Sequence, residues 1–252
     1  MRGERTRRIA VVCDPGAAES PAREYAELIS GLARTPARVL AAADRGAALP
    51  AEYGAVLLAH PGTGAASAAA RLREATGRFV LSDQDAAATA LAGMLLATLA
   101  RRGRAPRDAR VVLAGADRLP GLAALLIASN VRDITLWNAA DDAIFPLHQT
   151  VFGADAVIDL LGALPGGTDG SLAVLTEDDA HTAPCAAAGL LRAALHAPTL
   201  TGDVDTCHTA AAVLAAAVTP GRMVSHGAAR ELADLITEAV LTSLTPARAG
   251  SA

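Results

Sequence analysis

The sequence predicts an α/β protein whose core is a doubly wound parallel sheet of the Rossmann type. Apolar runs of strand length alternate with helical patterns along the chain, which is typical of parallel sheets covered by helices. Residues 111–138 also follow the order strand, glycine-containing loop, helix and strand, as in a dinucleotide-binding unit. At 252 residues the chain is long enough for one large domain or two small ones with a substantial core.

The first half is predicted to contain four strands and three helices. Each strand is a short run rich in Val, Leu, Ile or Ala, and strands are expected at residues 9–13, 38–41, 55–59 and 79–81. Helical patterns occur at residues 21–33, 65–75 and 86–101. The last of these helices is too short and too rich in Ala and Thr to span a bilayer.

The second half repeats this alternation and then becomes wholly helical. Strands are expected at residues 111–114, 134–137, 156–160 and 172–175, and helices at residues 119–129, 183–195, 204–218 and 226–241. Pro198 and Pro220 separate the last three helices. The predicted organisation is a first lobe at residues 1–84, a Rossmann-type NAD(P)-binding-like domain with C-terminal helices at residues 85–244, and a disordered tail at residues 245–252.

The composition excludes several classes of function. All 22 basic residues are arginine, so no lysine can act as a base or form a Schiff base. The net charge of −4 gives no electrostatic reason to bind nucleic acid. Three widely spaced cysteines fit a reducing cytosol, and the first apolar run is too short for a secretion signal. We therefore expect a cytoplasmic protein without a membrane anchor.

The glycine loop within residues 111–138 departs from a working dinucleotide fingerprint. Such a fingerprint needs glycines for a tight turn beside the pyrophosphate and an acid for the ribose hydroxyls. Here Gly115 is followed by Ala116 and Asp117, and Asn138 stands where the acid is expected. These four residues are the predicted cofactor-binding positions, and NAD(P) is predicted to bind there weakly or not at all.

Six segments resemble, in the same order, segments of the bacterial malic enzymes. Residues 12–27 resemble the family's YTPGVAEPC, and residues 50–85 resemble the stretch that carries its Glu-Asp metal pair and ends in DDQHGT. The glycine-loop unit follows, and residues 152–160, 187–195 and 204–218 resemble KGADVFIGV, FPGIFRGAL and INDEMKLAAAEAIA. The resemblance implies a reduced malic-enzyme-like N-terminal α/β lobe, a small-molecule substrate and a homo-oligomer, with a dimer expected.

The departures from the family pattern bear on activity. The family's catalytic Tyr falls on Cys13, its catalytic Lys lies in a deleted region, and its Glu-Asp metal pair falls on Ala59 and His60. The second Asp of DDQHGT is retained as Asp83. Because oxidative decarboxylation of malate needs a metal, a base and an acid, the resemblance implies that this chemistry has been lost. A divalent metal remains open, with His60 and Asp83 as its ligands.

Polar residues that follow predicted strands form the candidate catalytic site. The carboxyl ends of parallel strands open on one crevice, where ligands bind. The candidates are Cys13, Asp14, His60, Asp83 and Glu177.

Each candidate also has an ordinary structural interpretation. His60 opens a turn, and Asp83 or Asp85 caps the following helix. Cys13 beside Asp14 is interpreted as a small core residue, because a neighbouring acid raises the pKa of a thiol. Outside this set, we expect Arg192 to anchor a carboxylate inside the fold and His208 to be a packing residue.

Three functions remain open from the sequence. The leading hypothesis is a repurposed enzyme that acts on a small carboxylic acid in a biosynthetic pathway. The second is a catalytically inactive binding or partner subunit, and the third is a residual NAD(P)-dependent oxidoreductase. The first two differ in whether the polar groups at the strand ends converge on one pocket.

Overall fold

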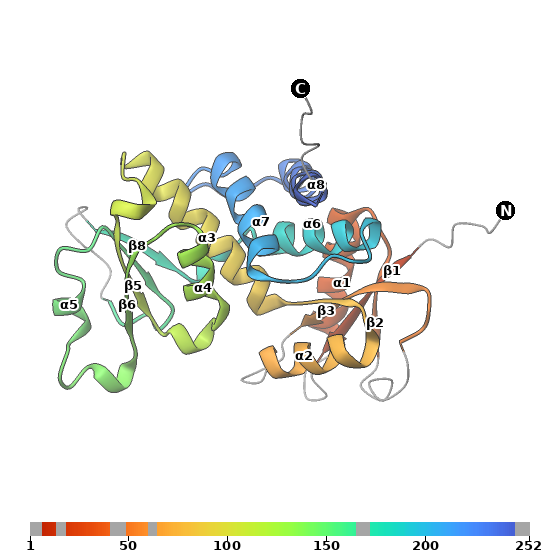
Figure 1. Cartoon of the computed structure of the whole chain (residues 1–252), viewed down its shortest axis with the longest axis horizontal. Helices are drawn as coiled ribbons and strands as arrows, with labels where there is room; N and C mark the ends of the chain where they lie inside the picture. Colours follow the sequence, from red (N-terminus) through yellow and green to blue (C-terminus); the bar gives the residue numbers. More distant parts are fainter. Residues whose placement is uncertain (1–6, 14–18, 41–48, 60–64, 165–171, 245–252) are drawn as a thin grey trace, which may run out of the picture.

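A computed structural model describes residues 7–13, 19–40, 49–59, 65–164 and 172–244. It contains two four-stranded parallel sheets, each in its own lobe, with a layer of long helices that joins them (Figure 1). The predicted tail at residues 245–252 lies outside the described residues. None of the helices in the described part of the chain is long and apolar enough to cross a membrane.

The first sheet has the strand order β2-β1-β3-β4. Its strands are β1 (Arg8–Cys13), β2 (Ala37–Leu40), β3 (Tyr53–Ala59) and β4 (Phe79–Ser82). Helix α1 (Glu19–Ala33) packs on one face through Ala26, Ile29 and Leu32. Helix α2 (Ala65–Thr76) packs on the other face, where Ala69 belongs to the same cluster as Val56 and Val80.

The second sheet has the order β6-β5-β7-β8. Its strands are β5 (Arg110–Ala114), β6 (Asp133–Trp137), β7 (Ala156–Asp159) and β8 (Ala173–Thr176). Helix α4 (Gly121–Ala128) covers one face through Leu122, Leu125 and Leu126. Short helix α5 (Leu147–Thr150) covers the other face, with Trp137 in the same cluster. Numbered within its own lobe, each sheet has the order 2-1-3-4.

Helix α3 (Asp83–Arg101) connects the two lobes. Ala86 and Ala90 belong to the core of the first lobe, whereas Leu91, Met94 and Leu95 belong to that of the second. The helix begins directly after β4 because Ser82 and Asp85 form a capping box around its first turn.

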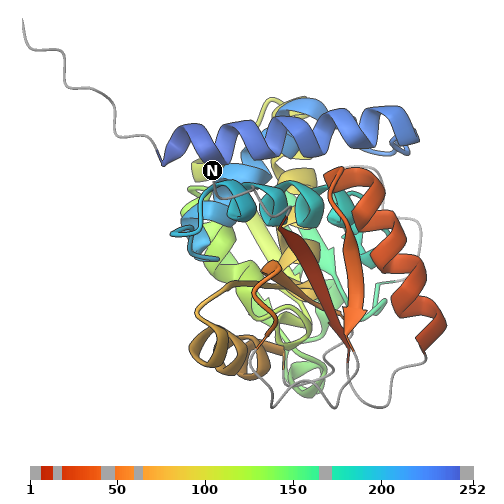
Figure 2. The ribbon, with the colours of Figure 1, turned by 90° about the vertical axis from the view of Figure 1, so that its right-hand side faces the viewer.

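The three C-terminal helices return to the first lobe. Helices α6 (Ala183–His196), α7 (Val204–Ala217) and α8 (His226–Ser243) follow the second sheet in sequence. Residues of α6 and α8 nevertheless belong to the apolar core of the first sheet, and α8 lies along the outside of α6 (Figure 2). The division of the chain at residues 84 and 85 stays a prediction.

All eight predicted strands and all seven predicted long helices are present, with shifts of a few residues at their ends. The main difference follows β5. Helix α4 begins at Gly121 instead of residue 119, after a 3₁₀ turn at Ala116–Arg118 and after Pro120. Helix α5 was not predicted, because four residues carry too little periodicity to be recognised.

Candidate functional site

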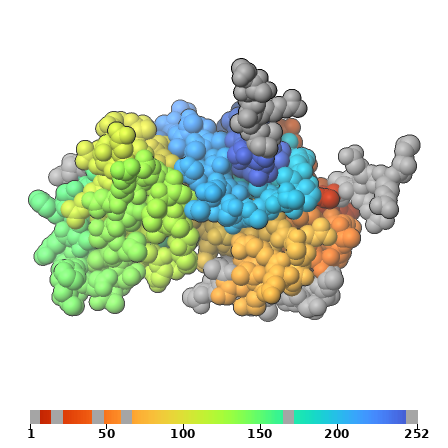
Figure 3. All heavy atoms as spheres, in the orientation of Figure 1, coloured from red at the N-terminus to blue at the C-terminus, as the bar shows by residue number. Residues whose placement is uncertain are grey.

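The direction of α6 brings the carboxyl ends of the two sheets to one region. Leu195, near the end of α6, lies against Gly54 at the start of β3. Helix α6 therefore runs antiparallel to β3, and its first residue, Ala183, lies toward the carboxyl end of the first sheet. The 3₁₀ turn at Glu177–Ala180 leads from β8 into α6, so the carboxyl end of the second sheet reaches the same region. The surface is notched here, between the lobes (Figure 3).

Asp83 and Tyr25 lie together on the first-lobe side of this region. Asp83 is the first residue of α3, and its Oδ1 atom is buried. Burial, and to a lesser degree the charge of Asp83, raises the pKa of Tyr25 above that of an ordinary phenol, so Tyr25 keeps its proton even in alkaline solution. Cys13 ends β1 and is partly buried. Sequence reasoning missed Tyr25, which lies mid-helix rather than at a strand end.

Glu177 lies on the second-lobe side, directly after β8. Its carboxylate is 3.4 Å from the guanidinium of Arg118, in the turn after β5. Both side chains are exposed, so the pair contributes little to stability. Glu177 therefore lies at the mouth of the region between the lobes and not in its interior.

Polar groups of the glycine loop and of Asn138 form hydrogen bonds with other residues of the chain. Gly115 has φ of +83°, and a Cβ atom there would lie 2.8 Å from Leu161 Cγ, so glycine is needed for the packing of Leu161. The N–H of Gly115 donates to the carbonyl of Trp137 at 2.8 Å. The N–H of Asn138 donates to Asp141 Oδ2 at 3.0 Å, and the carbonyl of Asn138 accepts from the N–H of Asp141 at 2.9 Å. These residues do not fit the cradle that a dinucleotide pyrophosphate and ribose require.

A cavity of about 510 Å³ lies at the carboxyl end of β6. Its walls are mostly apolar, and it has the size of a small-molecule pocket. Its residues are Trp137, Ala139, Asp142, Leu147, His148, Ala163 and Leu164.

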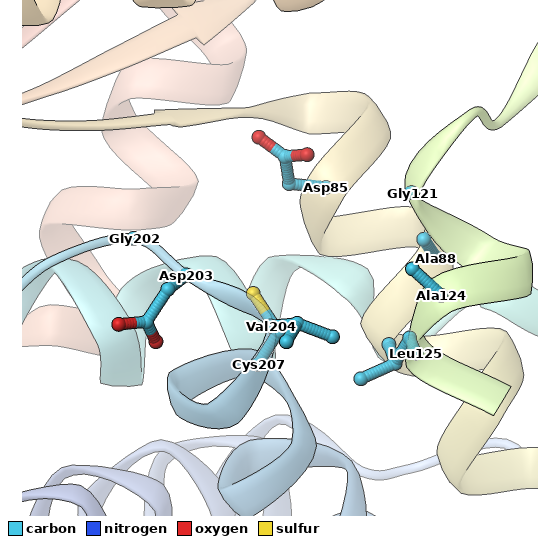
Figure 4. Close-up of a pocket in the computed structure, with 9 residues that line it drawn as sticks. All are labelled: Asp85, Ala88, Gly121, Ala124, Leu125, Gly202, Asp203, Val204 and Cys207. Atoms are coloured by element: carbon cyan, nitrogen blue, oxygen red, sulfur yellow. The ribbon is translucent and has the colours of Figure 1, made fainter. Parts of the chain in front are cut away.

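A smaller cavity of about 120 Å³ lies among the first turns of α3, α4 and α7 (Figure 4). Its two carboxylates have structural roles, because Asp85 caps α3 and Asp203 caps α7. Burial would raise the pKa of Asp203, but hydrogen bonds from Thr201 and Thr206 outweigh it and lower that pKa.

The thiol of Cys207 also faces this smaller cavity (Figure 4). Burial, assisted by the charges of Asp85 and Asp203, raises its pKa to about 11. The thiol therefore stays protonated at neutral pH and is a poor nucleophile.

Two of the five candidates cannot be placed. Asp14 and His60 lie outside the described residues, so the pairing of His60 with Asp83 stays a prediction. Within the described ranges, no three His, Cys, Asp or Glu side chains are grouped to hold a metal. Ala59, which the resemblance places at one of the family's metal-ligand positions, has no ligating group in its side chain.

The two residues expected to be structural have structural partners. Arg192 pairs with Asp234 of α8, which also pairs with Arg34 at 2.9 Å. His208 Nδ1 lies 3.1 Å from the hydroxyl of Ser129, at the end of α4. Neither residue belongs to the region between the lobes.

The arrangement of the lobes is that of malic enzymes. The structure matches the malic enzyme of Pyrococcus horikoshii with a TM-score of 0.72 at 13% identity, over 95% of this chain and 77% of that chain. It matches the NAD-dependent malic enzyme of Thermotoga maritima with a TM-score of 0.70 at 12% identity, over 94% and 85% of the two chains. It matches the malic enzyme of Entamoeba histolytica with a TM-score of 0.68 at 14% identity, over 95% of this chain and 70% of that chain. No family model matches the sequence, and no curated protein is significantly similar to it.

Proposed function

We propose that this protein is an enzyme of a biosynthetic pathway that acts on a small carboxylic acid. It binds its substrate between the two lobes and does not carry out conventional NAD(P)-dependent decarboxylation of malate. One observation supports the proposal most directly. The carboxyl ends of both sheets lie in one region, which contains the neighbouring residues Asp83 and Tyr25 and the first turns of α3 and α6. In open parallel sheets this is the position at which ligands bind.

The chemistry at this position uses the chain's own side chains. Asp83 accepts a hydrogen bond from a hydroxyl group of the substrate, and burial keeps the neighbouring Tyr25 phenol protonated as a donor. Lysine is absent from the sequence, and polar groups of the glycine loop and of Asn138 form hydrogen bonds with other residues of the chain. Both observations support chemistry other than hydride transfer from malate.

Binding measurements on Asp83 variants test this proposal. L-malate and a panel of small mono- and dicarboxylic acids are titrated calorimetrically into the wild type, Asp83→Leu and Asp178→Leu. Asp178 is an exposed residue of the turn after β8 and serves as the control. We expect at least one acid to bind the wild type and the control alike, and Asp83→Leu to bind it roughly tenfold more weakly.

Two results would contradict the proposal. Binding that is unchanged in Asp83→Leu would place the site elsewhere, and no binding by any acid would favour an inactive partner subunit. Thermal melting of each variant establishes that it is folded, and Tyr25→Phe provides a milder second variant in the same place.

The cavity at the end of β6 favours a second candidate function, a residual NAD(P)-dependent oxidoreductase. Its volume of about 510 Å³ and apolar walls suit a nucleoside. Calorimetric titration with adenosine, compared between the wild type and a Leu164→Arg variant, tests this candidate. This candidate function requires that adenosine binds the wild type and does not bind the Leu164→Arg variant.

We also propose that the protein is a cytoplasmic homodimer. None of the described cysteines Cys13, Cys185 and Cys207 forms a disulfide, which supports a reducing compartment. Alanine-rich helices such as α7 present little side-chain bulk, so a second copy can approach closely. Light scattering at micromolar concentration should give twice the chain mass of 25.3 kDa. A mass equal to one chain would contradict the dimer.

A further inference from the structure

Arginines are concentrated at the end of the second lobe that lies away from the region between the lobes. Five of the chain's 22 basic residues fall within residues 101–110, which lead from the end of α3 to the start of β5. Helix α3 runs to this cluster from Asp83 (Figure 1). It has 19 residues, so at 1.5 Å of rise per residue its ends lie roughly 27 Å apart. The cluster is therefore separate from the proposed carboxylic acid site.

A cavity of about 520 Å³ lies within this arginine cluster. It is lined by Leu99, Arg102, Arg104 and Asp155, so two of its four lining residues carry a guanidinium group. Its volume is that of a small-molecule pocket. Residues 101–110 precede β5 and Asp155 precedes β7, so the cavity lies at the amino ends of these strands, opposite their carboxyl ends.

The one acid that lines this cavity is already paired within the chain. Asp155 Oδ1 lies 3.0 Å from Nε of Arg104, and Asp155 Oδ2 accepts from the N–H of Arg110 at 2.8 Å. Two other aspartates lie close to the cluster, Asp108 within it and Asp133 beside Arg110 in the sheet. Five arginines against three aspartates leave an excess of positive charge, although the chain as a whole has a net charge of −4.

The dipole of α3 explains only part of this cluster. The negative end of a helix dipole stabilises cations within the last turn, and this accounts for Arg101, whose guanidinium also donates to the carbonyl of Pro220 at 3.1 Å. Arg107 and Arg110 lie beyond the end of the helix. The side chain of Arg107 is 63% exposed and lies 3.5 Å from Asp108, and surface pairs of this kind add little to stability.

An exposed phenylalanine lies beside the arginine cluster. Phe152 is 84% exposed and is one of three phenylalanines in the chain. Its carbonyl accepts from the guanidinium of Arg110 at 3.5 Å, and Asp155 of the cavity wall follows three residues later. Guanidinium groups bind phosphate oxygens in pairs, and exposed aromatic rings stack on bases. The two features together suit a phosphorylated ligand.

We propose that this cavity binds a polyphosphate group, such as that of a nucleoside triphosphate. Arg102 and Arg104 contact the phosphate oxygens from the cavity wall, and Phe152 stacks on the base of a nucleotide. A chain of phosphates suits several spaced guanidinium groups better than one carboxylate does, because each phosphate adds negative charge. The site lies apart from the carboxylic acid site and does not depend on it.

Calorimetric titration with ATP, inorganic tripolyphosphate and adenosine, without divalent cations, tests this inference. The wild type is compared with Arg102→Gln and Arg107→Gln, two exposed positions of the cluster. Arg71→Gln, at an exposed position of α2 in the first lobe, is the matched control. We expect both anions to bind the wild type and the control alike. Binding should be roughly tenfold weaker in Arg102→Gln, with a smaller loss in Arg107→Gln.

Phe152→Ala distinguishes the two sources of a polyphosphate group. Weaker binding of ATP with unchanged binding of tripolyphosphate supports a nucleotide. Unchanged binding of both anions supports an inorganic polyphosphate.

Three results would overturn the inference. They are binding of neither anion to the wild type, binding that is unchanged in both arginine variants, and adenosine binding as tight as that of ATP. ATP binding that is lost in Leu164→Arg would place the nucleotide in the cavity at the end of β6 and would also overturn it. Thermal melting establishes that each variant is folded, and Arg107→Gln carries the comparison if Arg102→Gln is not. None of these results bears on the carboxylic acid site.

Discussion

Polar side chains near the ends of the strands have two different uses in this chain. Asp85, Asp203 and Asp141 satisfy backbone N–H groups at the starts of helices or turns. Asp83 and Tyr25 instead lie close enough together for the charge of Asp83 to raise the pKa of Tyr25. A carboxylate three residues after a serine is typical of a capping box, which identifies Asp85 as the capping residue of α3.

At the scale of one residue, we expect the thiol of Cys207 to react slowly. Because burial raises its pKa to about 11, little thiolate exists near neutral pH. Its alkylation by iodoacetamide, followed by mass spectrometry, should accelerate continuously from pH 9 to about 11. An ordinary thiol is already half ionised at its pKa of about 8.5, so its rate levels off between about pH 9 and 10. Cys207 in the urea-unfolded protein is the control, and equal rates in both states would contradict the expectation.

The sequence could predict part of the candidate site for a simple reason. A residue that follows a strand in a parallel sheet must emerge at the carboxyl edge, so Asp83 and Glu177 were identifiable from their positions. Tyr25 was not selected, because it lies within a helix and only the packing of α1 on the first sheet brings it close to Asp83.

At the scale of elements, the helix layer depends on two close crossings. Gly93 of α3 lies against Leu214 of α7, and Gly189 of α6 lies against Ile236 of α8. At Gly93 an added Cβ would come within 2.6 Å of a side-chain atom across the crossing. Glycine is retained inside these helices because the backbones approach closely, despite its low helix propensity.

Gly189→Ala is expected to destabilise the protein by about 1–3 kcal/mol, since the new methyl group overpacks the α6–α8 contact. Its Cβ would lie 2.6 Å from Ile236 Cγ2 and 2.9 Å from the carbonyl oxygen of Ala233. Gly31→Ala is the matched control within α1, where only the Arg230 guanidinium lies near, at 3.9 Å. That change should stabilise by about 0.5–1 kcal/mol. Urea unfolding measures both, and a neutral Gly189→Ala would refute the crossing argument.

The β5–α4 connection leads to a prediction about the cofactor. NAD and NADP should bind weakly or not at all, because Gly115 packs against Leu161 and Asn138 forms hydrogen bonds within its own turn. Asp117 also adds negative charge near the expected position of the pyrophosphate. Calorimetric titration with each dinucleotide is the measurement. A dissociation constant in the low micromolar range would show that the loop rearranges to accept the cofactor.

At the scale of the whole molecule, long-range packing decides what the sequence could not. The sequence pattern predicted every long helix. It could not predict that α6 and α8 complete the core of the first lobe after the chain has built the second. It also did not reveal that the two sheets share a strand order, since the two lobes share no visible sequence repeat.

The whole molecule should show no conventional malic-enzyme activity. Purified protein with L-malate, Mg²⁺ or Mn²⁺ and either dinucleotide should form no reduced cofactor above background, because the chain contains no lysine and the resemblance places the family's tyrosine at Cys13. Absorbance of reduced cofactor is the readout. Turnover that disappears in an Asp83→Ala variant would refute the prediction.

The most direct test of a carboxylic acid site between the lobes is an NMR map of binding. Backbone amide shifts of the isotope-labelled protein are followed while L-malate, or the tightest acid of the panel, is added to saturation. The account predicts that the largest shifts cluster at the ends of β1 and β4 and at the starts of α3 and α6, around Cys13, Asp83 and Thr182. Shifts confined to the cavity lined by Trp137 and Leu164, or no shifts with any acid, would contradict it.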